Sequence, residues 1–162
     1  MNNIIQSLPK LEIRNNFRNS NFINEKGLKL YIPRGKKYIA WFRNVNNQPR
    51  CIIIEYKKNN KNNNKYFTNI ENKLVSFKEQ LTTGIGTILY GTLISNNSFV
   101  IEKVIYDKGE FKKHSNIMNH IENARNILSN NINEVNNIRY CMNFYFLEFQ
   151  NTPELLVPQV HT

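Results

Sequence analysis

Residues 86–109 read GTILYGTLISNNSFVIEKVIYDKG, and this stretch decides the fold. Two apolar runs, residues 88–94 and 99–106, are separated by a polar turn at residues 95–98. Apolar runs of this length around a short polar turn predict the two antiparallel strands of a β-hairpin. The second strand is followed by Asp107, Lys108 and Gly109, which are typical of a turn.

Four further strands are predicted upstream of the hairpin. Each is a short run of aliphatic and aromatic residues between segments rich in Pro, Gly or Asn, and they cover residues 28–32, 37–43, 51–56 and 66–70. We expect a basic turn around Gly35 to join the first two. Residues 74–81 fit either a strand or a turn of helix. The N-terminal segment, residues 1–27, shows only a weak hydrophobic pattern, and a short strand is expected at residues 8–13.

One long helix is predicted downstream of the hairpin. From Ser115 onwards, apolar residues recur in steps of three and four, which is the spacing of one helix face. The pattern predicts a helix over residues 115–136, with Ser115 as its N-cap. An aromatic strand is expected at residues 138–149, and residues 152–154 are expected to open a short helix.

The order of these elements predicts an α+β protein. We expect a single domain, residues 1–162, with a strand-rich core at residues 28–110. Its sheet should be mainly antiparallel, with six or more strands and one principal helix packed on it, because strands and helices do not alternate as in a doubly wound fold.

Composition agrees with a globular domain. Of the 162 residues, 40% are hydrophobic and 12% aromatic, which is enough to build a core. There is no apolar run of about 18 residues and no apolar segment among the first twenty, so we expect neither a membrane span nor a secretory signal. The two cysteines, Cys51 and Cys141, lie in apolar runs and are expected to be buried thiols.

The acidic residues are eleven Glu and a single Asp, Asp107. Aspartic dyads, EF-hand loops and two-metal sites need several close carboxylates, so this inventory argues against each of them. His120 and Glu122 match the His-x-Glu of zinc deaminases, but the Pro-Cys-x-x-Cys that completes such a site is missing. The glycines fit neither a dinucleotide-binding motif nor a P-loop. We therefore expect no catalytic residue, no metal and no cofactor.

Positive charge is concentrated in the first part of the chain. Residues 1–70 hold fourteen Lys or Arg against three Glu, a balance of +11, whereas the remaining residues hold eight basic and nine acidic side chains, a balance of −1. Such asymmetry is typical of a surface that meets phosphate groups. A lysine-rich surface without a ligand is the alternative interpretation.

Two stretches resemble known proteins. They are residues 32–42, IPRGKKYIAWF, followed by RCIIIE, and residues 86–109 with the segment GTILYGTL. Together they resemble a group of proteins of large cytoplasmic DNA viruses and, more distantly, the nucleotidyltransferase domain of mRNA guanylyltransferases and the cap-binding domain of snurportin. The resemblance covers roughly residues 30 to 110. It implies a nucleotidyltransferase-like fold, and a location in the cytoplasm of an infected host cell or in the virus particle.

The resemblance does not extend to catalytic residues. Guanylyltransferases attach the nucleotide to the lysine of a Lys-x-Asp-Gly motif, which does not occur in this sequence. Tyr90 and Thr92 stand where that family has Asp and Glu, and the later Lys-x-Lys strand is missing. The resemblance therefore implies a catalytically silent module, similar to snurportin-like domains that keep a pocket for the methylated cap.

Cations and aromatic rings are interleaved around the only tryptophan. Cations bind phosphates, and the face of a Trp ring attracts a positively charged methylated guanine. The candidate RNA- or cap-binding residues are therefore Arg34, Lys36, Lys37, Trp41 and Arg43. A lone Trp in the middle of a strand is also typical of a core, so both interpretations of Trp41 stay open at this point.

Three functions of different classes are compatible with these patterns. The first is a catalytically silent nucleotidyltransferase-like module that binds RNA, with the capped 5′ end of mRNA as a candidate ligand. The alternative is a structural or assembly protein of a large DNA virus particle or of another complex. The third is a nucleotidyltransferase completed by another chain.

Overall fold

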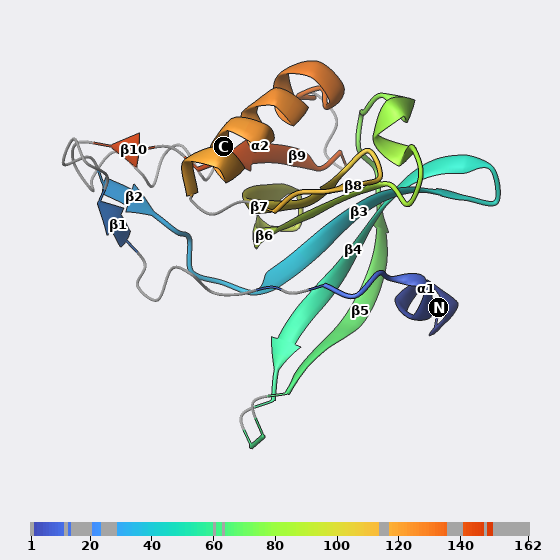
Figure 1. The fold of residues 1–162 in the computed structure, drawn as a ribbon, viewed down its shortest axis with the longest axis horizontal. Coiled ribbons are helices and arrows are strands. Elements are labelled where there is room, and N and C mark those ends of the chain that lie inside the picture. Colours follow the sequence, from blue (N-terminus) through green and yellow to red (C-terminus); the bar gives the residue numbers. More distant parts are fainter. Residues whose placement is uncertain are drawn as a thin grey trace.

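The structure is a computed structural model that describes residues 2–11, 13, 21–23, 29–59, 61–62, 64–113, 117–135, 141–147 and 149–150. Its main element is a seven-stranded, mostly antiparallel sheet with the strand order β5-β4-β3-β6-β7-β8, in which β9 also pairs with β7 (Figure 1). One main helix, α2, lies over this sheet (Figure 1). The α+β class, the mainly antiparallel sheet of six or more strands and the principal helix are thus confirmed.

The strands of the main sheet are long at its centre and short at one edge. They are β3 (Lys37–Val45), β4 (Gln48–Lys58), β5 (Lys65–Lys73), β6 (Thr87–Ser95), β7 (Ser98–Asp107), β8 (Glu110–Phe111) and β9 (Asn143–Phe146). Between β5 and β6 the chain passes through the 3-10 helix η1 (Glu79–Thr82) and returns beside β3. The hairpin of β6 and β7 is the one that residues 86–109 predict.

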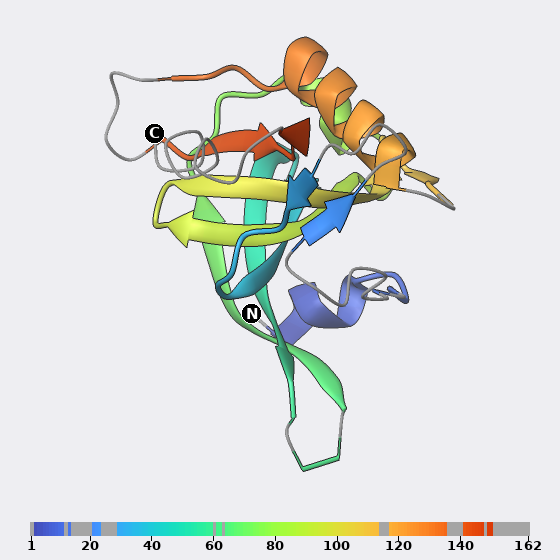
Figure 2. The same ribbon diagram turned by 90° about the vertical axis from the view of Figure 1, so that its left-hand side faces the viewer.

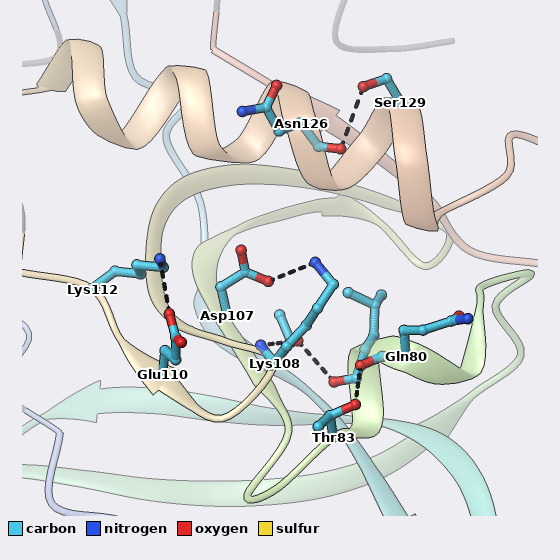
Figure 3. Close-up of polar contacts among 10 residues, drawn as sticks. Gln80, Thr83, Asp107, Lys108, Glu110, Lys112, Asn126 and Ser129 are labelled. Atoms are coloured by element: carbon cyan, nitrogen blue, oxygen red, sulfur yellow. Dashed lines mark hydrogen bonds and ion pairs between the residues drawn. The ribbon is translucent and has the colours of Figure 1, made fainter.

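Tight turns with positive φ join two of the antiparallel pairs. Asn46 and Asn47, between β3 and β4, have φ of 52° and 63°, and Lys108 and Gly109, between β7 and β8, have 51° and 87°. Positive φ at both central residues gives the twist that a two-residue hairpin needs, and Asn and Gly tolerate it best. At the second turn, Lys108 Nζ donates to Asp107 at 3.1 Å (Figure 3). The only aspartate of the chain therefore ends β7, beside the lysine of the turn.

A second, three-stranded sheet has the order β1-β2-β10. Its strands are β1 (Asn21–Ile23), β2 (Lys29–Tyr31) and β10 (Phe149–Gln150), and both pairs are antiparallel. The basic segment around Gly35 joins β2 to β3, as predicted, but these two strands belong to different sheets. This segment, residues 32–36, therefore links the two sheets and is not a hairpin turn; we call it the link.

Apolar side chains cover both faces of the main sheet. On one face, Ala124 of α2 (Ile117–Asn131) lies in a buried cluster with Phe42 and Leu89. On the other face, Ile4 of α1 (Asn2–Ser7) packs against the cluster that contains Trp41 (Figure 1). Successive side chains of a strand point to opposite faces, so the unbroken apolar runs of β3, β4 and β6 follow from this two-sided burial.

Helix α2 is shorter than the predicted 115–136. It ends at Asn131 because the next residues join a different segment: Ile132 forms a bridge with Phe77, and the Asn133 N–H donates to the Ser76 carbonyl at 2.8 Å. The predicted N-cap, Ser115, lies outside the described residues. Among the described residues, no helix is both long enough and apolar enough to span a bilayer.

Three other predicted segments differ from the structure. Residues 8–11 and 13 form no strand; they follow α1 and pack against the main sheet as irregular chain. The strand predicted at 138–149 is divided into β9 and β10, which lie in different sheets, and between them Leu147 packs with Val100 and Ile121. Residues 74–81 form isolated bridges at Leu74 and Phe77 and then enter η1. The short helix expected at 152–154 lies outside the described residues.

Close packing requires the two glycines of GTILYGTL. A Cβ on Gly86 would lie 2.0 Å from the Phe42 carbonyl oxygen, and one on Gly91 would lie 1.9 Å from the Val100 carbonyl oxygen. Gly86 also has φ of 95°, which favours glycine. The glycine spacing of this segment therefore has a structural cause, the approach of β6 to β3 and β7.

Candidate nucleic-acid interface

The hairpin of β4 and β5 extends beyond the rest of the main sheet (Figure 2). The first residue of β3, Lys37, pairs with Tyr56, so β4 continues past the beginning of its neighbour. Lys57 pairs with Tyr66 on β5 instead. We call residues 56–67 the basic arm. It contains four lysines and no acidic residue, the lysines being at positions 57, 58, 61 and 65.

One face of the basic arm is closed against the body of the protein. Tyr56 and Phe67 are cross-strand partners whose ring centroids lie 5.3 Å apart, and both pack against the cluster around Trp41. Lys65 Nζ donates to the Ile13 carbonyl at 3.1 Å and lies 5.9 Å from the centroid of the Tyr56 ring. These contacts anchor the arm at its base.

The opposite face carries the cross-strand pair Lys57 and Tyr66. Lys57 Nζ lies 3.7 Å from Glu55 Oε2, and the Lys57 side chain stays 41% exposed. Glu55 is buried at the base of the arm and also accepts a hydrogen bond from Asn69 Nδ2 at 2.7 Å. The buried carboxylate is thus compensated from two sides, while Lys57 remains in contact with solvent.

Lys37 is held inside the main sheet. Its Nζ donates to Glu102 Oε2 at 2.9 Å, to Thr92 Oγ1 at 2.5 Å and to the Pro33 carbonyl at 3.0 Å. An ammonium group has three donors, and all three have acceptors here. The Thr92 hydroxyl donates in turn to Glu102. Lys37 therefore fixes the link to β3, and its charge is balanced by Glu102.

Arg34 and Lys36 are exposed cations of the same link. The Leu93 N–H donates to the Lys36 carbonyl at 3.3 Å, which holds the link beside β6. The pairing of Lys37 with Tyr56 places the link and the basic arm at the same end of the main sheet. Within the described parts of the chain, neither Arg34 nor Lys36 forms an ion pair.

Trp41 is a core residue. Only 2% of it is exposed, and its Nε1 donates to the Ile85 carbonyl at 2.7 Å. The Arg43 guanidinium lies 4.4 Å from the centroid of the Trp41 ring and donates to Ser7 Oγ at 2.8 Å. Of the two interpretations of Trp41, the core position is confirmed. The assignment of Trp41 as a candidate cap-binding residue is corrected, because its buried ring is not accessible for stacking.

The five candidate residues do not form one site. Lys37 and Arg43 lie six residues apart on β3, which corresponds to about 20 Å along a strand. Arg34 and Lys36 lie at the same end as the basic arm, whereas Arg43 lies towards the β3–β4 turn. The structure thus brings Arg34 and Lys36 together with the arm and separates them from Trp41 and Arg43.

Two ionisable groups near this region have a shifted pKa, and both are buried or partly buried. Burial lowers the pKa of Lys103, an effect that Glu102 opposes and Lys65 reinforces. Burial also raises the pKa of Tyr38, and the nearby Glu55 and Glu71 raise it further. In the part of the chain that the structure describes, no group of three His, Cys, Asp or Glu side chains could hold a metal ion.

The sequence contained a signal for the arm that motif-based reasoning did not select. The strands predicted at 51–56 and 66–70 leave residues 57–65 as the connection between them, and the lysines of this connection are not among the candidate residues. The signal is the run of four lysines without an acid between two strands, 51–56 and 66–70. Strands that continue into such a run make a charged two-stranded arm rather than a loop.

Comparisons with known proteins show no family for this chain. No protein-family model, no curated protein and no solved structure matches it. The nucleotidyltransferase-like fold therefore stays a prediction. A function can be proposed from the arrangement of the described residues and from their charges.

Proposed function

We propose that the protein binds RNA through the phosphate groups, with the basic arm as the main contact, and that it does so without catalysis. The observation that carries the proposal is the arm itself: four lysines on a hairpin that projects from the body, with no acid among residues 56–67. Arg34 and Lys36 add positive charge at the same end of the sheet.

The physical reason is the release of counterions. Each lysine that neutralises a phosphate frees a condensed cation, so affinity falls steeply with salt, with a slope of about −0.7 per phosphate contact on a single strand. Four arm lysines would therefore contribute about −3 to the slope of log K against log salt. The resemblance to mRNA guanylyltransferases favours RNA among the polyanions with this phosphate chemistry.

We do not propose that the protein recognises the methylated cap. Recognition of the methylated guanine was expected to use stacking on Trp41. Because that ring is buried and its Nε1 bonds to Ile85, capped and uncapped RNA are expected to bind equally.

The test is fluorescence anisotropy of a labelled RNA oligonucleotide at about 50 and 200 mM salt. The arm variant replaces Lys57, Lys58, Lys61 and Lys65 with Gln. A matched control replaces four lysines elsewhere, Lys78, Lys108, Lys112 and Lys113. Both variants change the net charge from +10 to +6, so they remove the same amount of charge at different places.

We expect the arm variant to lose about three units of the salt slope and most of the affinity, whereas the control should keep the slope of the wild type. Equal losses in both variants would show that net charge, and not the arm, attracts RNA. Absence of binding by the wild type at the lower salt concentration would contradict the proposal as a whole.

A second candidate function, a subunit of an assembly, is favoured by one exposed apolar corner. The Gly109 N–H donates to the Gly86 carbonyl at 2.9 Å, which brings the β7–β8 turn to the segment before β6. Ile85 and Phe111 flank this contact and are 42% and 56% exposed. Light scattering of the wild type and of Phe111→Asp tests this role, which predicts a mass above 19.2 kDa that the substitution reduces.

A further inference from the structure

Tyr66 is an exposed aromatic residue within the basic arm. It is 46% exposed, whereas Tyr56 and Phe67 are only partly exposed and pack against the cluster around Trp41. Tyr66 therefore adds little to the core. A ring that lies among lysines on a projecting hairpin offers a flat apolar surface to a ligand that also carries negative charge.

We propose that Tyr66 is a stacking platform for an unpaired base, so that the arm prefers single-stranded RNA to duplex RNA. This inference rests on the proposed RNA binding and adds to it a contact with a base. Every base has a π-face, so such a platform tolerates any sequence.

The position of Lys57 supports this assignment. Lys57 and Tyr66 are cross-strand partners on one face of the arm, where Cβ atoms of partners lie about 5 Å apart. The contact of 3.7 Å between Lys57 Nζ and Glu55 Oε2 holds the lysine at the base of the arm. One nucleotide could thus place its base on the Tyr66 ring while the neighbouring phosphates meet the arm lysines.

The same geometry disfavours a duplex. The bases of a double helix are already stacked and paired, and the major groove of A-form RNA is too deep and narrow for side chains to read. A duplex could therefore use only the lysines of the arm. A single strand could use both the lysines and the ring.

The first experiment needs no substitution in the protein. The wild type is titrated with a single-stranded RNA of about twelve nucleotides, with an oligonucleotide of the same length whose central residues are abasic, and with the blunt duplex. The two single strands carry the same phosphates, so their difference isolates the bases. We expect the abasic strand to bind about tenfold more weakly.

The second experiment uses Tyr66→Ala, Tyr66→Phe and, as a control at another exposed ring, Phe111→Ala. Tyr66→Ala should weaken binding of the single strand by about tenfold and leave duplex and abasic binding within about twofold. Tyr66→Phe keeps the ring and should bind like the wild type, as should Phe111→Ala.

The outcomes separate this inference from the proposed function. Salt-dependent binding that ignores both the bases and Tyr66 would overturn the stacking platform and leave the phosphate contacts in place. No binding of any of the three RNAs would overturn both. A loss of affinity in Tyr66→Ala that is equal for all three RNAs would also overturn the platform, since it would show an effect on the arm as a whole.

Discussion

Lys37 Nζ lies 2.9 Å from Glu102 Oε2, although their strands, β3 and β7, are not neighbours in the sheet. β6 lies between them, and its Thr92 hydroxyl accepts from Lys37 and donates to Glu102. The pair therefore ties three strands together and, through the Pro33 carbonyl, holds the link from the small sheet. Since Glu102 is only 4% exposed, its charge depends on this partner.

Replacing Lys37 with Met should lower the free energy of unfolding by about 3 kcal/mol, because Glu102 would stay buried and lose its cation. The double variant Lys37→Met/Glu102→Gln should be more stable than Lys37→Met, since it leaves no unpaired charge. Urea unfolding followed by circular dichroism measures both. A double variant less stable than Lys37→Met would show that the ion pair is not the cause of the loss.

The strands could be predicted from the sequence because burial on both faces gives long apolar runs with clear ends. β6 and β7 are the best example, since the polar residues 95–98 separate their apolar runs, and in the structure Ser95 and Ser98 pair at the ends of the two strands. The division of residues 138–149 into β9 and β10 could not be predicted, because the aromatic run continues through both. In the structure Leu147, which follows β9, packs with Val100 and Ile121.

The candidate site was predicted less well, for a related reason. The positive balance of residues 1–70 includes the arm lysines, but the lysines that are paired with an acid could not be identified from it. The charge of Lys37 is balanced by Glu102, a residue 65 positions away, and the register of β3, β6 and β7 creates that contact. Most arm lysines lie beyond the acidic side chains of the sheet because β4 and β5 extend past β3, and Lys57, near Glu55, is the exception. This extension depends on strand lengths that the sequence defines poorly.

Lys103 should make stability depend on pH. Burial lowers the pKa of Lys103 from its usual value near 10.5, so between the two values the unfolded chain binds more protons than the folded chain. Lys103 should therefore make the free energy of unfolding rise with pH through that interval, whereas Cys51, whose pKa burial raises, should make it fall where the unfolded thiol ionises. Lys103→Met should remove the rise, whereas the control Lys112→Met should keep it.

The measurement for Lys103 is urea unfolding at several pH values between about 7 and 9.5. Higher pH is avoided because burial raises the pKa of Tyr38: above about pH 10 the unfolded chain releases that proton first, and stability falls. An identical pH dependence in the wild type and in Lys103→Met would contradict the assignment to Lys103.

The chain is expected to form no covalent bond with a nucleotide. Incubation with radiolabelled GTP or ATP and Mg²⁺ should leave the protein unlabelled after denaturing electrophoresis. The amine of Lys37, at the start of β3, is held by Pro33, Thr92 and Glu102, so it is not free to approach a phosphorus atom. A labelled band that persists after denaturation, and that disappears in Lys37→Met, would contradict this expectation.

Trp41→Ala should lower the free energy of unfolding by about 3–5 kcal/mol, since it removes a fully packed ring and leaves a cavity in the cluster with Ile52 and Tyr90. Trp41→Phe keeps most of the volume and loses the hydrogen bond to the Ile85 carbonyl, so its cost should be smaller, about 1–3 kcal/mol. Thermal unfolding of both variants measures these losses, and anisotropy below the midpoint measures RNA affinity. Because the Trp41 ring is buried and its partner on β4, Ile52, precedes the arm, Trp41→Phe should bind RNA like the wild type. A folded Trp41→Phe protein with weakened RNA binding would place Trp41 at the ligand after all.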